Sequence, residues 1–178
     1  MRLFVAIDIP ADAQMTLDNL LNHLRPTAKL SWTSVEKLHI TTKFMGEWPE
    51  DRIGEMKLAL EGMERTGAFD VTIAGLGWFP DARNSRVLFA KVDGGEPLRS
   101  LAKVTEEAVH RLGIPVETRV YSPHLTLARV RDRVPLDALK RAIDALASTN
   151  FGMFRAQAFY LYLSSAGRYT KLAEFSLV

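Results

Sequence analysis

The chain of 178 residues combines 23 lysines and arginines with 21 aspartates and glutamates, and it has four histidines and no cysteine. A chain of this length buries roughly 70% of its unfolded surface, and the absence of cysteine excludes disulfide scaffolds, thiolate zinc sites and cysteine nucleophiles. The net charge of +2 is too weak a field for non-specific duplex binding, and no stretch approaches the roughly 18 apolar residues that span a bilayer.

The first half of the chain alternates predicted strands and helices. A β-rich run ending before Pro10 predicts a strand over residues 3–9, and helical spacing of apolar residues then predicts a helix up to Pro26. A second strand is expected over residues 38–44. A helix should follow from Pro49 to near Gly67, with acidic residues in its first turn that match the helix dipole. We expect a strand over residues 69–73 and then a loop carrying Gly75, Gly77 and Pro80.

The second half predicts the same order of elements. Strands are expected at 86–92 and around 124, with helices over 97–112 and from 135. Further strands are expected from 154, at 156–167 and at 169–177, the last completing the second sheet. Five landmarks recur about 85 residues apart, which indicates an internal duplication. The chain is therefore expected to form one bilobal domain over residues 1–178, with repeats at approximately 2–85 and 86–178.

Two histidines occur in the same short pattern at matched places of the repeat. His39 and Thr41 share one face of a predicted strand, as do His124 and Thr126, because side chains alternate along a strand. If a two-fold axis relates the lobes, the two pairs face each other across a cleft. One imidazole could take a proton while the other gives one, and the hydroxyls could bind phosphate oxygens. This arrangement suits a phosphodiester, and the chemistry needs no metal.

The two motifs resemble those of the 2H phosphoesterase superfamily, and most closely the RNA 2′,3′-cyclic phosphodiesterases, also called 2′-5′ RNA ligase-like proteins. The similar segments are residues 2–10, 38–47 and 122–129 and the terminal strand pair at 159–169. The resemblance implies an α/β (α+β) fold in which two mainly antiparallel sheets, flanked by helices, surround a central water-filled cleft with pseudo-two-fold symmetry. It covers essentially the whole chain.

The resemblance also implies roles for individual residues. His39 and His124 would be the acid–base pair, and Thr41 and Thr126 the phosphate-binding residues. We assign His39 as the proton donor on O3′ and His124 as the proton acceptor for water. Water would open the cyclic phosphate to a 2′-phosphate end. The reverse chemistry would join a cyclic phosphate to a 5′-hydroxyl in a 2′-5′ linkage. The symmetry of the sequence does not itself distinguish acid from base.

Arg129, Phe44 and Lys43 are further candidates near the motifs. The resemblance places Arg129 and Phe44 near the nucleotide, although strand parity puts Arg129 on the face opposite His124. Arg129 therefore reaches the cleft only if its strand twists, bulges or ends there. Phe44 could stack on a base or belong to the core, and Lys43 could line the RNA entrance or cap a solvated strand end.

Other function classes stay open at this stage. The same fold could act on ADP-ribose 1″,2″-cyclic phosphate or another small cyclic nucleotide, and a non-catalytic RNA-binding module could keep both motifs. A metal-dependent hydrolase is disfavoured, because no acidic residue lies within either motif. We expect no cofactor or metal, a partner bearing a 2′,3′-cyclic phosphate, no membrane association, a cytoplasmic location and a monomer.

Overall fold

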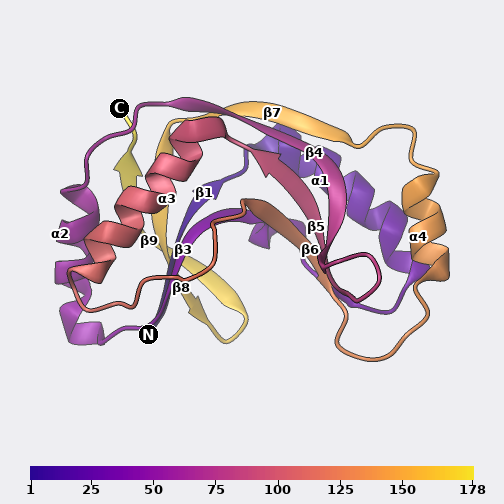
Figure 1. Ribbon diagram of the computed structural model, residues 1–178, viewed down its shortest axis with the longest axis horizontal. Helices are drawn as coiled ribbons and strands as arrows, with labels where there is room; N and C mark the ends of the chain where they lie inside the picture. Colours follow the sequence, from indigo (N-terminus) through magenta and orange to yellow (C-terminus); the bar gives the residue numbers. More distant parts are fainter.

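The computed structural model describes residues 1–178 and shows two lobes side by side, each built on one antiparallel sheet (Figure 1). One sheet has the strand order β3-β1-β8-β9 and the other β2-β6-β5-β4-β7. The strands are β1 (Arg2–Asp8), β2 (Ser31–Trp32), β3 (His39–Glu47), β4 (Phe69–Pro80), β5 (Ser85–Asp93), β6 (His124–Arg129), β7 (Asn150–Ala156), β8 (Ala158–Ser165) and β9 (Arg168–Ser176). The helices are α1 (Ala11–Leu24), α2 (Ile53–Glu61), α3 (Gly95–His110) and α4 (Asp137–Asp144). This arrangement confirms the predicted fold class.

The two halves of the chain exchange elements between the lobes. Helix α1 follows β1 but packs on β7 and α4 of the other lobe, whereas α3 follows β5 but packs on β3 and α2 (Figure 1). Strand β4 joins the sheet of the second half, and β8 and β9 join the sheet of the first. The prediction that residues 169–177 complete the second sheet is therefore wrong. They pair with β8 beside β1.

The strand orders of the two sheets nevertheless match. Strand β1 lies between β3 and β8 in one sheet, and β5 lies between β6 and β4 in the other. Strand β4 thus corresponds in place to β8. Phe154 lies on β7, where it pairs with Val71 of β4. The two sheets thus share one strand order around a central strand. The internal duplication itself stays a prediction.

Strand β4 is longer than the sequence predicts. It continues through the expected loop because a register shift between Ile73 and Leu76 absorbs Gly75, whose φ of +89° suits glycine. Gly77 lies directly under the ring of Phe89 on β5, with no room for a side chain. The loop therefore shrinks to residues 81–84, and the added strand length carries Phe79 to the cleft.

The hydrophobic core runs through both lobes as one continuous cluster. Strand β1 is buried along most of its length between β3 and β8, which explains its near-continuous apolar sequence. In α1 the buried residues recur at helical spacing and face the other lobe: Ala13, Leu17, Leu20, Leu21 and Leu24. Each sheet is covered by a helix that follows the central strand of the other sheet in the chain. The two lobes are therefore joined by one hydrophobic core.

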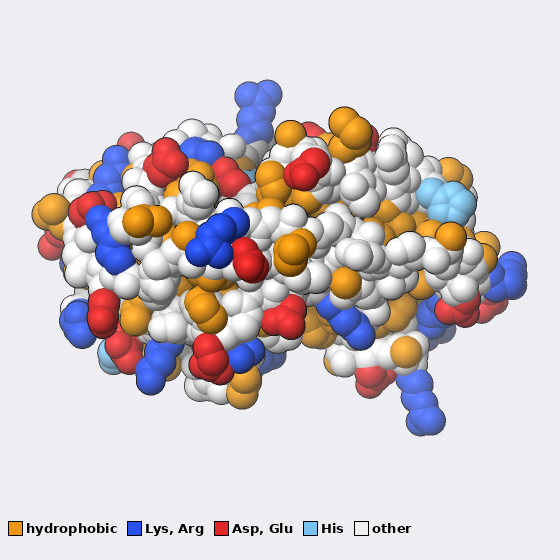
Figure 2. Space-filling view, turned by 90° about the horizontal axis from the view of Figure 1, so that it is seen from above, with side chains coloured by type: hydrophobic (Ala, Val, Ile, Leu, Met, Phe, Trp, Pro, Cys, Tyr) orange, Lys and Arg blue, Asp and Glu red, His pale blue; other side chains and the backbone are white.

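The outer surface carries charges of both signs. Figure 2 shows one face, on which basic, acidic and apolar side chains are interspersed without a stripe of a single charge. None of the four helices combines the length and apolar character needed to cross a membrane.

The contact between Gly77 and Phe89 predicts a stability difference between two glycines. A Cβ added at Gly77 would lie 2.6 Å from Phe89 Cζ, and that ring is already stacked on Phe79 at 4.0 Å between centroids. Gly77→Ala should therefore destabilise the fold by about 1–3 kcal/mol through overpacking. The matched control Gly54→Ala, in α2 with no atom within 4 Å, should be neutral or stabilise by up to about 1 kcal/mol. Urea unfolding measures both, and equal effects would contradict this account.

Candidate active site

The cleft between the lobes is a cavity of about 970 Å³. Strands β3 and β6 approach each other beside it, and further walls come from β1, β4, α3 and the segment 117–122. The cavity is lined by every site residue that the sequence predicts: His39, Thr41, Phe44, His124, Thr126 and Arg129. The two motifs, 85 residues apart in the chain, are thus brought to one cleft.

A bulge in each motif strand puts a third side chain on the cleft face. On β3, Asp8 pairs with His39, Ala6 with Thr41 and Phe4 with Phe44, and the register shifts past Thr42. Directly paired residues share a face of the sheet, so Phe44 joins the face of His39. Its side chain is 70% exposed and is not a core aromatic.

Strand β6 has a bulge at the corresponding place. Lys91 pairs with His124, Phe89 with Thr126 and Val87 with Arg129, with a register shift that leaves out Leu127. Arg129 therefore reaches the face of His124 through a bulge, one of the conditions that strand parity had required. The two strands share one pattern, in which a histidine, a threonine and, after the bulge, Phe44 or Arg129 face the cleft.

Both histidines are anchored in the same way. His39 Nδ1 lies 2.9 Å from the carbonyl oxygen of Lys37, and His124 Nδ1 lies 2.7 Å from that of Ser122. A carbonyl oxygen can only accept, so each Nδ1 carries the proton and donates it. In the neutral rings Nε2 is therefore unprotonated, which leaves one nitrogen of each imidazole free to take and give a proton.

His39 lies in a charged and aromatic environment. Its side chain is only 10% exposed, and Nε2 is 3.6 Å from Asp8 Oδ1. The Tyr162 hydroxyl donates to the same oxygen, and Lys171 Nζ lies 2.7 Å from Asp8 Oδ2. Burial lowers the pKa of His39 and outweighs the raising effects of the Lys37 carbonyl and of Asp8, while Lys171 lowers it further.

His124 lies in a different environment. Its ring makes edge contacts with Phe79 and Phe89, at centroid distances of 4.9 and 5.7 Å. Its partner in strand register is a cation, Lys91, whereas the partner of His39 is the carboxylate of Asp8. The cleft is thus symmetric in its histidines and threonines and asymmetric in the charges beside them.

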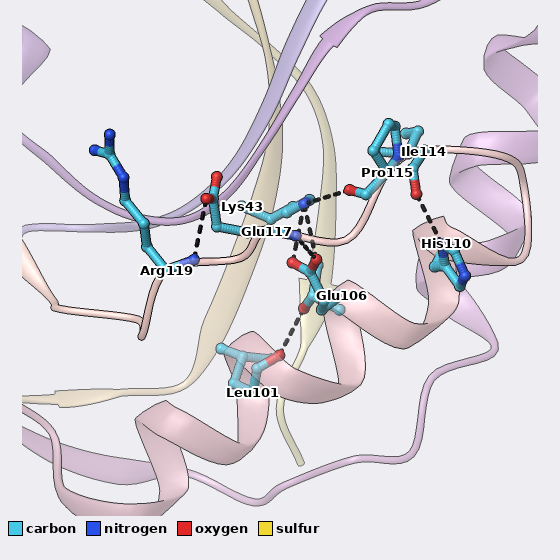
Figure 3. Close-up of polar contacts among 9 residues, drawn as sticks. Lys43, Leu101, Glu106, His110, Ile114, Pro115, Glu117 and Arg119 are labelled. Carbon is cyan, nitrogen blue, oxygen red and sulfur yellow. Dashed lines mark hydrogen bonds and ion pairs between the residues drawn. The ribbon is translucent and has the colours of Figure 1, made fainter.

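Lys43 is among the residues that line the cleft, and it is buried there and does not cap a solvated strand end. The register shift turns its side chain away from His39, and it is 7% exposed in an ion pair with Glu106 of α3 at 2.9 Å (Figure 3). It also donates to the Pro115 carbonyl, while Glu106 accepts from the backbone N–H of Glu117. Lys43 thus fastens the segment that leads from α3 towards His124 against β3.

A tyrosine secures the same segment nearer to the motifs. The Tyr121 hydroxyl donates to the Thr41 carbonyl at 3.0 Å. Burial raises the pKa of Tyr121, so its hydroxyl stays a donor throughout the physiological range. Segment 111–123 therefore reaches His124 from a position tied at several points to the strand that bears His39.

Comparison with known proteins identifies the family. A family description, the 2′-5′ RNA ligase superfamily, matches residues 10–168. The chain belongs to this superfamily. It is 30% identical over 168 residues to an RNA 2′,3′-cyclic phosphodiesterase of Methanocaldococcus jannaschii, a match that covers 93% of this chain and 92% of the relative.

Solved structures agree with that membership. A Thermus thermophilus protein superposes with a TM-score of 0.80 at 30% identity and covers 99% of this chain and 98% of its own. E. coli LigT, solved in complex with phosphate, gives a TM-score of 0.75 at 25% identity and covers 98% of this chain and 96% of its own. The resemblance and the predicted enzyme class, a phosphodiesterase of this superfamily, are confirmed.

Sequence reasoning missed the residues that surround the histidines. Asp8 and Lys171 come from strands at opposite ends of the chain, and their approach to His39 depends on β9 joining the first sheet. Tyr169 is not among the missed residues, because it belongs to the terminal strand pair that carries the resemblance. It lines the cleft near His39, with ring centroids 5.8 Å apart. The one available signal was Asp8 itself, a carboxylate that ends an otherwise apolar strand.

The anchoring of the histidines predicts their NMR behaviour. Long-range ¹H–¹⁵N spectra should show His39 and His124 as neutral Nδ1–H tautomers, and His39 should titrate below its ordinary value of 6.5. Lys37 and Ser122 supply backbone oxygens, so substituting their side chains should leave both tautomers unchanged. An Nε2–H tautomer in either ring, or a His39 pKa at or above 6.5, would contradict this reading of the site.

Proposed function

We propose that this protein hydrolyses RNA 2′,3′-cyclic phosphate ends to 2′-phosphate ends, with His39 and His124 as the acid–base pair. The observation that carries the proposal is the pair of imidazoles, each anchored through Nδ1, that line one cleft together with Thr41 and Thr126. Support comes from relatives named as RNA 2′,3′-cyclic phosphodiesterases and from the phosphate complex of E. coli LigT.

The proposed reaction is an in-line displacement at phosphorus. His124 Nε2 accepts a proton from water as the water oxygen attacks the cyclic phosphate, and His39 Nε2–H⁺ gives a proton to O3′ as the P–O3′ bond breaks. The hydroxyls of Thr41 and Thr126 donate hydrogen bonds to the non-bridging oxygens, whose negative charge grows in the transition state. The product carries a 2′-phosphate and a free 3′-hydroxyl.

The charges beside the histidines support this assignment of roles. The Asp8 carboxylate stabilises a proton on His39 Nε2, where the general acid must carry one. The corresponding register position beside His124 holds Lys91, and His124 takes part in none of the ion pairs of the structure. Only the His39 side therefore offers a carboxylate to a protonated ring.

The same groups can accommodate ligation. A 5′-hydroxyl of RNA in place of water would attack the cyclic phosphate, lose its proton to His124 and leave a 2′-5′ linkage after His39 protonates O3′. Both histidines lie in the cleft of a single chain, so a monomer is sufficient, and the expected monomeric state stays a prediction. No three His, Asp or Glu side chains converge as a metal-binding group, and the proposed steps use the imidazoles alone.

The first test is hydrolysis of an oligoribonucleotide with a 2′,3′-cyclic phosphate end. His39→Ala and His124→Ala should each lower turnover by about two to four orders of magnitude, the usual cost of losing a general acid or base. His23→Ala, an exposed histidine on α1, is the matched control and should retain wild-type turnover.

The products and the substrate range complete this test. The wild type should release only 2′-phosphate ends and should keep its activity in excess EDTA. A 3′-phosphate product would overturn the regiochemistry, and activity abolished by EDTA and restored by a metal would overturn the metal-free mechanism. Turnover of ADP-ribose 1″,2″-cyclic phosphate without turnover of RNA ends would overturn the proposed substrate.

The second test concerns the acid role of His39. Asp8→Asn removes the neighbouring anion and lowers the pKa of His39 further, whereas Lys171→Met removes the opposing cation and raises it. At pH 7.5, above the pKa of His39, the protonated fraction of a general acid follows that pKa. Asp8→Asn should then slow kcat/KM and Lys171→Met should speed it, because the rate follows the protonated fraction of His39.

Two other roles of His39 and its neighbours predict different results. If His39 were the general base, it would already be neutral at pH 7.5, and Asp8→Asn would leave kcat/KM unchanged or raise it slightly. If the network were merely structural, both variants would be slower and the pH–rate profile would keep its midpoints. Either result would overturn the assignment of His39 as the acid.

A further inference from the structure

A second, smaller hollow opens from the cleft beside Arg129. This side pocket has a volume of about 190 Å³ and lies between the β2–β6 edge and the turn that joins β8 to β9. Four of its residues also line the main cleft: Thr33, Lys37, Arg129 and Tyr169. A chain molecule whose end lies in the cleft can therefore continue into the side pocket.

The side pocket gathers positive charge without a counter-charge. Lys37, Arg129 and Arg131 line it, and no carboxylate does. None of the three cations takes part in an ion pair, whereas Lys43, which lines the main cleft, does. Three cations that converge on one hollow repel each other, and an anion bound among them relieves that repulsion.

The remaining lining indicates which anion. Arg131 is oriented by its Nε hydrogen bond to Ser31 Oγ at 2.9 Å, which leaves its terminal nitrogens free to donate. Tyr169 offers an aromatic ring, 41% exposed, with Lys37 Nζ 5.7 Å from its centroid. Cations that track a backbone beside a ring on which a base can stack are typical of single-stranded nucleic-acid sites. The volume, several times the ~30 Å³ of one water, accommodates a polyatomic anion such as phosphate.

The position of the side pocket relates it to the reacting phosphate. Arg129 follows Thr126 by three residues on the same face of β6, a separation of about 10 Å along the strand. Lys37 comes two residues before His39 and supplies the carbonyl that anchors it. The cationic hollow thus lies next to both motifs, where the neighbouring phosphate of the same strand would arrive.

We propose that the side pocket binds the phosphate on the 5′ side of the terminal nucleotide, so that the protein selects a cyclic phosphate carried by an RNA chain over a cyclic mononucleotide. This inference rests on the proposed function and names its substrate class. Binding energy from the second phosphate holds the reacting end in place, so it improves kcat/KM for longer substrates only.

The test compares three substrates of increasing extent: a nucleoside 2′,3′-cyclic phosphate, the same compound with a 5′-phosphate, and a dinucleotide with a 2′,3′-cyclic end. For the wild type, kcat/KM should rise with the added phosphate, and the gain should shrink as salt is raised. Arg131→Met should lower that gain roughly tenfold, as expected for the loss of one hydrogen bond to a charged group. It should leave kcat/KM for the nucleoside 2′,3′-cyclic phosphate without a 5′-phosphate unchanged.

Two control variants isolate the charge of Arg131. Arg133→Met removes an exposed arginine that lines neither cavity, and it should preserve the full gain. Ser31→Ala removes the hydrogen-bond partner of Arg131 but keeps its charge, and it should preserve most of the gain. Together they distinguish loss of a phosphate contact from a general change in charge or in the β2–β6 edge.

The results separate this inference from the proposed function. If all three substrates were hydrolysed with equal kcat/KM, the proposed phosphate-binding role of the side pocket would be overturned. The proposed function of the protein would still stand. A gain that Arg131→Met and Arg133→Met reduce equally would also overturn it, because the effect would then be long-range charge. No hydrolysis of any substrate would overturn the proposed function itself.

Discussion

The arrangement of the cleft depends on hydrogen-bonded ladders that draw each sheet from both halves of the chain. Strand β1 is paired on one side with β3 and on the other with β8, and β5 lies in the same way between β6 and β4. Both motif strands are therefore held against a central strand, and the helices that cover each sheet arrive from the opposite lobe. Because these connections cross between the lobes, the distance between the two histidines is a property of the whole fold.

The buried polar side chains of this fold all form hydrogen bonds. No buried side-chain nitrogen or oxygen lacks a hydrogen-bond partner. In the ion pair of Lys43 and Glu106 the lysine is buried and the glutamate half-buried, so loss of hydration offsets much of their attraction. The pair instead fixes the position of the segment that leads to His124, because both side chains bind the backbone of that segment. Asp8 does the same for the other side, where Tyr162 and Lys171 hold its carboxylate beside His39.

The sequence predicted what depends on periodicity and composition, and it failed where one residue changes the register. Alternation correctly placed His39 with Thr41 and His124 with Thr126 on shared faces, and the element types followed from apolar spacing. Alternation could not show the bulges at Thr42 and Leu127, because such bulges depend on the partner strand. Simple parity thus puts Lys43 on the sheet face of His39 and Arg129 on the face opposite His124, and both assignments are wrong.

Long-range exchange was equally invisible in the sequence. The residues of β4 around Gly75 and Gly77 predicted a loop, because glycine and proline normally interrupt strands. In the folded protein these glycines instead accommodate a register shift and the ring of Phe89. Nothing local indicates that β8 and β9 return to the first sheet, and the Asp8–Lys171 pair beside His39 exists only because they do. The electrostatic asymmetry of the site is therefore a tertiary property.

The place of β1 also bears on how the chain reaches its native state. One of the two partner strands of β1 spans residues 158–165, more than 150 residues further along the chain. Contacts at such sequence separation are costly to close and slow folding. Until β8 docks, β1 is a near-continuous apolar strand with one unpaired edge, at which other chains can associate.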